Sequence, residues 1–208
     1  MKTISECRLY GIVDTGYVTP DNMVSMTRSL IRGGADIVQL RAKKEPIDAI
    51  LAMARELAPI CREAGIPFIL NDYPELVRDC GAAGAHVGQD DLSVAEARRL
   101  AGASAIIGKS THSLEQAVAS SGEKPDYIGF GPLFATPTKP DYLPIGTKEI
   151  MEVHRLLEFP IFCIGGIKQS NLAGVVTAGA RRVVIVSDLL LAPDPAQRTA
   201  ECKALLIS

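Results

Sequence analysis

The chain contains the stretch Asp126-Tyr-Ile-Gly-Phe-Gly-Pro-Leu-Phe-Ala-Thr-Pro-Thr-Lys139, in which a short apolar segment is followed by a loop rich in hydrogen-bond donors. The first residues, Asp126–Gly129, are predicted to form a buried strand. Glycines in the loop allow a ligand to approach the backbone, and Thr136, Thr138 and Lys139 can donate to phosphate oxygens. A strand that ends in such a loop is typical of the active-site end of an α/β barrel; an ordinary polar surface loop is the alternative.

Seven further segments of the same apolar, β-branched kind recur along the chain, with helical patterns between them. Because the segments are mostly apolar rather than alternating, they suit a parallel sheet that is covered on both faces. The clearest helix is predicted over Pro46–Ala64, where apolar residues recur on one face and Gly65 follows the end. The eight strands are expected at Leu9–Val13, Asp36–Leu40, Pro67–Leu70, Ala85–Val87, Ala105–Gly108, Asp126–Gly129, Ile161–Ile164 and Val183–Val186.

This alternation predicts the α/β class and a (β/α)8 TIM barrel that forms a single domain over residues 1–208. An open, doubly wound sheet is the alternative. It is disfavoured because Val13-Asp-Thr-Gly-Tyr17 follows the first strand, where a dinucleotide-binding sheet would carry Gly-x-Gly-x-x-Gly. Polar residues at the carboxyl ends of many different strands also favour the barrel.

Composition and charge narrow the class of protein. Hydrophobic residues make up 47% of the chain and charged residues 22%, as in an ordinary globular protein. The net charge of -2 creates no field that would recruit nucleic acid or an anionic membrane, so neither partner is expected. No signal peptide or membrane-spanning run is found, which predicts a soluble, cytoplasmic protein; a homo-oligomer stays open. Five cysteines without metal-type spacing are expected to be buried, reduced thiols: Cys7, Cys61, Cys80, Cys163 and Cys202.

The second strand ends in Gln39-Leu-Arg-Ala-Lys43, whose alternate residues share one face of an extended segment. Gln39, Arg41 and Lys43 are therefore expected to point together toward the barrel opening. An amide can read a ring edge or a hydroxyl, while guanidinium and ammonium groups bind phosphate. A solvated basic cluster is the alternative, and it is weakened because Gln39 and Arg41 lie within a strand that is otherwise buried.

Two neighbouring strands, the third and the fourth, each deliver a carboxylate to the same rim. Asn71-Asp72 ends the third strand, and His86-Val-Gly-Gln-Asp-Asp91 contains the end of the fourth. Mg²⁺ commonly takes one or two carboxylates and completes its shell with phosphate oxygens and water. Asp72 and Asp91 are therefore candidate Mg²⁺ ligands, shared with a substrate pyrophosphate. Each alone could instead be a turn or helix-start residue.

The remaining strand ends carry weaker signals. Gly108-Lys-Ser-Thr-His112 ends the fifth strand, where Ser110 can donate to an anion and His112 is either a proton shuttle or structural. His154 lies in a helical pattern and is expected at the surface. Gly166, within Ile164-Gly-Gly-Ile167, and Val186-Ser187 end the seventh and eighth strands, where barrels often bind a monophosphate. The sequence thus predicts one anion site for pyrophosphate with Mg²⁺ and another for a monophosphate, an arrangement suited to group transfer with loss of pyrophosphate.

The ordered set of these motifs closely resembles the thiamine-phosphate synthase family over nearly the whole chain, from Leu9 to about Ser187. The motifs are Gln39-x-Arg-x-Lys43, Asn71-Asp72, His86-x-Gly-Gln-x-Asp91, Gly108-x-Ser-x-His112, Gly131-Pro-x-x-x-Thr-x-Thr-Lys139, Gly165-Gly-Ile167 and Val186-Ser187. The resemblance implies a TIM barrel that joins hydroxymethylpyrimidine diphosphate to thiazole phosphate, forming thiamine monophosphate and releasing pyrophosphate. It further implies a dissociative mechanism, in which pyrophosphate leaves before the thiazole nitrogen captures a pyrimidine methyl cation.

The resemblance also implies roles for individual residues. Asp72 and Asp91 would coordinate Mg²⁺, and Gln39 would contact the pyrimidine. The pyrophosphate would be held by Arg41, Lys43, Asn71, Ser110 and Lys139, of which Arg41, Lys43, Ser110 and Lys139 are the candidate catalytic residues. The binding site for thiazole phosphate would be lined by Thr136, Thr138, Gly166, Val186 and Ser187.

Two positions depart from the family pattern. Asp188 follows Val186-Ser187 where a small residue is usual, and Ala180-Arg-Arg182 stands where the family commonly has Ala-Asp-Gly. A carboxylate near a phosphate pocket would repel the phosphate unless its side chain turns away or caps a helix, and the arginines could compensate or face solvent. Two alternative functions stay open: a thiazole tautomerase, which does not need the diphosphate residues, and a non-catalytic barrel that binds a phosphorylated ligand.

Overall fold

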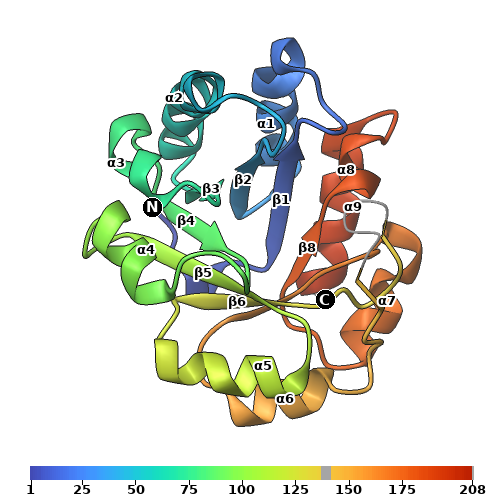
Figure 1. Cartoon of the computed structure of the whole chain (residues 1–208). Helices are drawn as coiled ribbons and strands as arrows, with labels where there is room; N and C mark the ends of the chain where they lie inside the picture. The colour runs from blue at the N-terminus through green and yellow to red at the C-terminus, as the bar shows by residue number, and fades with distance from the viewer. Residues whose placement is uncertain (137–141, 208) are drawn as a thin grey trace.

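Eight parallel strands close into a barrel in the computed structural model, which describes residues 1–136 and 142–207 (Figure 1). The strands are hydrogen-bonded in the order of the chain, and β8 pairs with β1 to close the ring. The predicted (β/α)8 TIM barrel is confirmed. The strands are β1 (Leu9–Asp14), β2 (Ile37–Arg41), β3 (Phe68–Asn71), β4 (Gly84–Val87), β5 (Ile106–Thr111), β6 (Tyr127–Phe130), β7 (Ile161–Cys163) and β8 (Val183–Ile185).

Helices surround the strands and cover the outer face of the barrel (Figure 1). The α-helices are α1 (Met23–Arg32), α2 (Ile47–Glu63), α3 (Val77–Cys80), α4 (Val94–Ala101), α5 (Leu114–Ala119), α6 (Ile150–Leu156), α7 (Gln169–Thr177), α8 (Ser187–Leu190) and α9 (Pro195–Ile207). Short 3-10 helices lie at η1 (Ile4–Glu6), η2 (Pro20–Asn22), η3 (Pro74–Leu76) and η4 (Ser120–Glu123). None of the helices within 1–136 and 142–207 is both long enough and apolar enough to cross a bilayer.

Sequence signals account for several helix boundaries. The Ser93 hydroxyl accepts from Glu96 N–H at 3.3 Å, and the Glu96 carboxylate accepts from Ser93 N–H at 3.2 Å, which is the predicted capping box of α4. Ser113 caps α5 in the same way, through Gln116 N–H. The long α2 begins one residue after Pro46 and ends one residue before Ala64, close to the predicted bounds.

The side chains of the strands divide into two cores, because successive residues of a strand point to opposite faces. The larger core lies between the barrel and its helices and includes Leu9, Val38 and Ile107. The smaller core fills the barrel interior. It contains Ile4, Cys7, Tyr10, Ile12, Ile37, Ile69, Tyr127, Phe162 and Val184. Three of its rings meet edge to face, with centroids 5.5 Å apart for Tyr10–Phe162 and for Tyr127–Phe162 and 5.9 Å for Tyr10–Tyr127. The barrel is therefore closed beneath its mouth by packed side chains.

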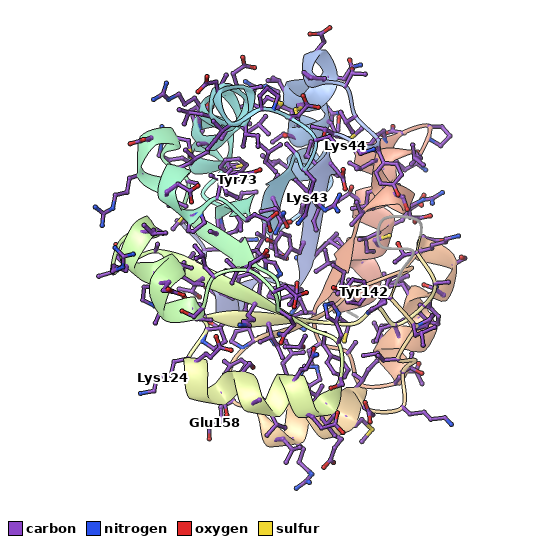
Figure 2. The ribbon with its side chains drawn as sticks, viewed as in Figure 1. Lys43, Lys44, Tyr73, Lys124, Tyr142 and Glu158 are labelled. Carbon is purple, nitrogen blue, oxygen red and sulfur yellow. The ribbon has the colours of Figure 1, made fainter. Side chains whose placement is uncertain are left out.

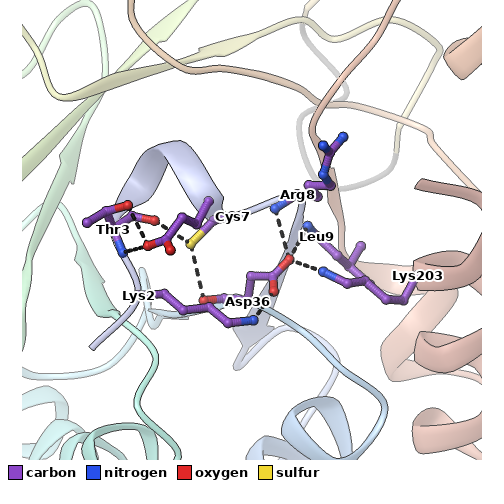
Figure 3. Close-up of polar contacts among 8 residues, drawn as sticks. Lys2, Thr3, Cys7, Arg8, Leu9, Asp36 and Lys203 are labelled. Atoms are coloured by element: carbon purple, nitrogen blue, oxygen red, sulfur yellow. Dashed lines mark hydrogen bonds and ion pairs between the residues drawn. The ribbon is translucent and has the colours of Figure 1, made fainter. Parts of the chain in front are cut away.

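The amino-terminal end of the barrel is held by Asp36, the residue before β2 (Figure 3). Its carboxylate is 1% exposed and accepts from the backbone N–H groups of Arg8 at 2.9 Å and Leu9 at 3.0 Å. It also forms ion pairs with Lys2, at 2.5 Å, and with Lys203 of α9. These bonds lower the Asp36 pKa to about 2 although burial alone would raise it. One carboxylate thus ties the start of the chain, β1 and the last helix together.

Strand β5 is longer than the sequence analysis predicts, because it continues past Gly108 to Thr111. Lys109 lies on the outer face of this strand and is 6% exposed, and its ammonium forms an ion pair with Glu123 at 2.9 Å. The Thr111 hydroxyl donates to the Gly129 carbonyl at 2.9 Å. Both polar side chains therefore have a partner on a neighbouring element, which allows them to lie within β5. Ser110, between them, faces the barrel interior.

Candidate active site

A pocket opens at the carboxyl ends of the strands, where the sequence analysis places the chemistry. Its walls come from strands all around the barrel and from the loops that follow β6, β7 and β8. Eight of the residues predicted to bind substrate line it: Gln39, Arg41, Asn71, Ser110, Thr136, Gly166, Val186 and Ser187. Thr138 and Lys139 lie outside the residues that the structure describes, so their predicted roles stay predictions.

Arg41, the last residue of β2, is oriented by a carboxylate that the sequence analysis does not single out. Its Nη1 lies 2.7 Å from Asp14 Oδ2, and Asp14 is the register partner of Arg41 on β1. The Asp14 side chain is buried and also accepts from the Gly16 N–H at 2.8 Å. One edge of the guanidinium is thus fixed, which preorganises Arg41 to present its remaining donors to an anion.

Asp72, Asp91 and Lys43 gather beside the main pocket rather than within it. Lys43 Nζ lies 2.7 Å from Asp72 Oδ2, and Figure 2 shows Lys43 on the side of the barrel opening formed by β1 and β2. Asp72 and Asp91 line an adjoining hollow between η3 and the start of α4. Asp91 also accepts from the Gly88 N–H at 2.6 Å, so its carboxylate holds the loop after β4. Its predicted role as a metal ligand stays a prediction.

The two carboxylates suit a divalent cation. Burial raises the pKa of Asp72, and the neighbouring Asp91 charge raises it further, while Lys43 opposes this rise. A cation bound at these carboxylates would offset the repulsion that raises the Asp72 pKa. Within 1–136 and 142–207, no group of three or more His, Cys, Asp or Glu side chains is arranged to hold a metal. A pair of carboxylates matches the smaller protein contribution that Mg²⁺ uses when substrate phosphates complete its shell.

A chain of hydrogen bonds crosses the floor of the pocket from β2 to β5. Gln39 Nε2 donates to the Tyr10 hydroxyl at 2.7 Å, and the hydroxyls of Tyr10 and Tyr127 are 3.0 Å apart. The Tyr127 hydroxyl lies 3.1 Å from His86 Nδ1, and His86 Nε2 lies 2.9 Å from Ser110 Oγ. Burial raises the pKa of both tyrosines, which keeps the two phenols neutral.

One arrangement of the hydrogens satisfies every group in this chain. Gln39 Nε2 donates to the Tyr10 hydroxyl, the Tyr10 hydrogen points at Tyr127, and the Tyr127 hydrogen points at His86 Nδ1. In this arrangement His86 carries its proton on Nε2 and donates to Ser110 Oγ, and every hydroxyl hydrogen below Ser110 has an acceptor. The Ser110 hydrogen is then directed to the pocket, where an anion can accept it.

Tyr10 and Tyr127 are missed by the sequence analysis as site residues, and so is the connecting role of His86. The signal was present in the alternation of the strands. Tyr10 stands two residues before Ile12, and Tyr127 two residues before Gly129, so each shares the inward face with another pocket residue. His112 also lines the pocket. Its Nδ1 lies 2.6 Å from the Gly131 carbonyl oxygen, and its ring is 4.2 Å from that of Tyr142, which Figure 2 shows toward β8 and α7.

The glycine loop after β7, residues 165–167, forms another wall of the pocket. Gly166 has a φ of +63°, and a Cβ there would lie 2.7 Å from the Ala135 carbonyl oxygen and from Phe134 Cβ, so glycine is required. Asn171 holds the loop from within α7, since its amide donates to the Gly166 carbonyl at 3.0 Å and accepts from the Lys168 N–H at 2.8 Å. The backbone N–H groups of Gly166 and Ser187 donate to no other backbone group in the described part of the chain. They are available to an anion.

Asp188 does not face this pocket. Its Oδ1 lies 3.0 Å from Arg198 Nη1, and its Oδ2 accepts from the Gln169 N–H at 2.9 Å. The carboxylate therefore turns away and caps α7, which removes the predicted repulsion of a bound phosphate. Arg181 and Arg182 precede β8 and lie at the other end of the barrel, where Arg182 donates to the Ser5 carbonyl at 2.8 Å. They do not compensate charge in the pocket.

The expectation that His154 is a surface residue is wrong. Its ring is half-buried in α6, and burial lowers its pKa to about 4, with the charges of Arg181 and Arg182 acting in the same direction. The Nε2 atom is buried and has no hydrogen-bond partner among the described residues. The five cysteines are buried and free, as predicted.

Comparison with known proteins supports the resemblance. The family model described as thiamine monophosphate synthase matches residues 9–189. The chain is 40% identical over 188 residues to a thiamine-phosphate synthase of Shouchella clausii, covering 90% of each chain. It is 42% identical over 170 residues to one of Thermus thermophilus, covering 81% of this chain and 82% of that one. The structure is similar to that of thiamine phosphate pyrophosphorylase from Pyrococcus furiosus, with a TM-score of 0.89, 27% identity and coverage of 98% and 97%.

Proposed function

This chain belongs to the thiamine monophosphate synthase family, and we propose that the strand-end pocket carries out the family reaction with the residues described above. The chain is a transferase that condenses the hydroxymethylpyrimidine diphosphate with thiazole phosphate, giving thiamine monophosphate and pyrophosphate. The observation that carries the site assignment is convergence: eight predicted binding residues, drawn from strands around the barrel, line one pocket.

The diphosphate is assigned to the side of the pocket formed by β2, β3 and β5. Arg41 presents donors held in place by Asp14, and Asn71 and Ser110 line the same cavity. Lys43 is close by at the rim, and Lys139 belongs to this set by its position in the sequence motif. Gln39 lies deeper, beside Tyr10, and is assigned to the pyrimidine. Charged and hydroxyl donors thus surround the leaving group, and aromatic and apolar side chains surround the ring.

Mg²⁺ is the metal that this site suits, with Asp72 and Asp91 as its protein ligands. When bound, it would supply positive charge to the diphosphate oxygens. Lys43 forms an ion pair with Asp72, and once that carboxylate is engaged by the metal the Lys43 ammonium would be free to contact the diphosphate. Asp72 and Asp91 would then bind the metal, and Lys43 and Arg41 would bind the diphosphate.

The thiazole phosphate is assigned to the wall built by the loops after β6, β7 and β8. Gly166 and Ser187 offer backbone N–H groups, Ser187 adds its hydroxyl, and Val186 and Thr136 line the adjoining surface. Thr138 is assigned here by sequence alone. The second substrate would therefore approach from the side of β8, opposite the diphosphate.

The chemistry proposed for this pocket is dissociative. The bond between the pyrimidine methylene carbon and the diphosphate oxygen breaks, and its electron pair leaves with the diphosphate. Arg41, Lys43 and Ser110 stabilise the charge that develops on the leaving oxygens. The resulting methylene cation is shielded from water by the buried floor of Tyr10, Tyr127 and Phe162, until the thiazole nitrogen donates its lone pair to the methylene carbon.

The test of this assignment compares purified Ser110→Ala and Asp72→Asn with the parent and with Asp21→Asn, an exposed carboxyl that does not line the pocket. We expect each site variant to lower kcat by at least about 10²-fold, the scale of single electrostatic contributors, without change in the circular dichroism spectrum. Near-parental rates in both site variants would refute the residue roles. Isomerisation of a thiazole carboxylate phosphate in place of condensation would favour the tautomerase, and tight binding without turnover would favour the non-catalytic barrel.

The location of the protein in the cell and its oligomeric state are separate proposals. Five free, buried thiols fit a reducing compartment, in agreement with the predicted cytoplasmic location. Cell fractionation tests this, and a soluble reduced protein is the expected result. Whether copies of the chain associate stays a prediction for sedimentation analysis.

A further inference from the structure

Asp188, the second residue of α8, joins three helices behind the glycine loop. It follows Ser187 in the chain, accepts from the Gln169 N–H at the start of α7, and forms an ion pair with Arg198 of α9. Its side chain is 14% exposed, and it does not line the pocket. The carboxylate is therefore held inside the structure by two partners from different elements, at 2.9 Å and 3.0 Å.

The position of Asp188 matters because the monophosphate wall is built from two separate units. Gly166 belongs to the loop between β7 and α7, and Ser187 is the first residue of α8, shortly after β8. Asn171 and the Phe134 N–H, which donates to the Gly165 carbonyl at 3.0 Å, fix the first unit internally and toward β6. Asp188 follows Ser187 directly in the chain, and its carboxylate accepts from the Gln169 N–H at the end of the loop that holds Gly166. Asp188 therefore connects the two units.

We propose that Asp188 is a positioning residue for the thiazole phosphate, and this inference rests on the proposed function of Gly166 and Ser187. By bonding the Gln169 N–H, the carboxylate fixes the distance between the N–H groups on the two loops. A phosphate that accepts from both loops gains full affinity only when their donors are already in place, because hydrogen bonds weaken steeply with distance and angle.

Arg198 has two functions in this arrangement. Its guanidinium neutralises Asp188, so the carboxylate adds no uncompensated negative charge behind the phosphate wall. It also anchors Asp188 to α9, where Arg198 has a second carboxylate partner, Glu201, at 3.5 Å. The last helix of the chain thereby contributes to the geometry of a binding wall that it does not itself line.

The test uses full-length Asp188→Ala with a closely matched control, Asp126→Ala. Asp126 also accepts one backbone N–H, that of Ile107 at 2.7 Å, and forms one arginine ion pair, with Arg98 at 3.0 Å, but it lies before β6 at the far end of the barrel. The KM values for thiazole phosphate and pyrimidine diphosphate are measured separately, with kcat and thermal stability. Asp188→Asn keeps an acceptor for the Gln169 N–H but loses the charge.

We expect Asp188→Ala to raise the KM for thiazole phosphate on the order of 10-fold, the scale of one or two lost hydrogen bonds, with the KM for pyrimidine diphosphate changed less than about twofold. Asp188→Asn should lie between the parent and Asp188→Ala, and Asp126→Ala should leave both KM values near parental. If Asp188→Ala fails to fold, Asp188→Asn and Arg198→Met report the same selective rise in KM or its absence.

Equal KM values in Asp188→Ala and Asp126→Ala would overturn the inference, and so would a parallel rise in both substrates' KM. Gly166→Ala and Ser187→Ala separate this failure from failure of the proposed site, because the first places a Cβ 2.7 Å from the Ala135 carbonyl oxygen in the phosphate wall and the second removes the Ser187 hydroxyl. If either of them raises the KM for thiazole phosphate while the Asp188 variants do not, the positioning role alone is wrong. If neither they nor the Asp188 variants change that KM, the phosphate is bound elsewhere and both proposals fail.

Discussion

Replacing Asp36 by asparagine tests how the amino-terminal end of the barrel is held. Asparagine has nearly the shape of a protonated aspartate, so the variant retains an acceptor for the Arg8 and Leu9 N–H groups but loses the charge that attracts Lys2 and Lys203. The folded pKa of Asp36 is about 2 and its ordinary value is 3.8. That difference corresponds to about 2 kcal/mol of unfolding free energy at pH 7, which Asp36→Asn should lose.

The pH dependence of this loss has a definite sign. Because the folded pKa is depressed, the stabilisation is fully present above the unfolded pKa of 3.8 and disappears as the pH falls through about 2. The difference in unfolding free energy between the parent and Asp36→Asn should therefore shrink from about 2 kcal/mol at pH 7 to about 1 kcal/mol at pH 3. A loss of about 2 kcal/mol in a chain of this length lowers Tm by roughly 4–8 °C.

Urea unfolding followed by circular dichroism at pH 7, 5, 4 and 3 measures this difference. Asp21→Asn removes the same charge at an exposed position and should leave the stability near parental at each pH. A difference for Asp36→Asn that is the same at pH 3 and pH 7 would refute the electrostatic argument. It would show that the carboxylate acts through shape and hydrogen bonding alone.

Three further changes probe the pocket and its surroundings. Tyr127→Phe removes the link between Tyr10 and His86, and it should cost roughly 1–3 kcal/mol in urea unfolding and lower kcat in steady-state assays, because it leaves buried polar groups unpaired. Gly166→Ala places a Cβ 2.7 Å from the Ala135 carbonyl oxygen, so it should raise the KM for thiazole phosphate more than that for the diphosphate. His154 has a folded pKa of about 4, below its ordinary 6.5, so the parent should lose stability as pH falls from 6.5 toward 4; His154→Leu should lose less over that range in thermal melts.

The fold was predictable because its signals are local and repeated. Short apolar strands, capped helices such as α4, and glycines after helices each follow from a few neighbouring residues. The errors lie where a tertiary partner changes the meaning of a residue. The predicted strand stops before Lys109, yet Lys109 lies inside β5, where an ion pair with Glu123 neutralises its charge. Ile47 is an apolar residue within the helix predicted over Pro46–Ala64, yet it is 47% exposed at the first turn of α2.

The lining of the candidate site was predictable where its residues stand at strand ends, since a barrel brings those ends together whatever lies between them. Gln39, Arg41, Ser110 and Ser187 are of this kind. Residues that act through a distant partner were not predictable. Asp14 supports Arg41 across a strand pair, and Tyr10 meets Tyr127, which is 117 residues away along the chain.

Asp188 shows the same dependence on distant partners, but here the sequence predicted an effect that the structure does not support. Its position beside Val186-Ser187 predicts repulsion of a phosphate, but the direction of its side chain decides the effect. Arg198, ten residues further along the chain, and the Gln169 N–H draw the carboxylate away from the pocket. A sequence gives the neighbours of a charge along the chain, whereas its electrostatic effect depends on the neighbours in space.

The most direct test of the account is an assay of the purified chain with the pyrimidine diphosphate, thiazole phosphate and Mg²⁺, in which thiamine monophosphate is read as fluorescent thiochrome. The account predicts product that requires both substrates, disappears with EDTA and returns when excess Mg²⁺ is added. Folded protein that binds either substrate but forms no product under these conditions would contradict it.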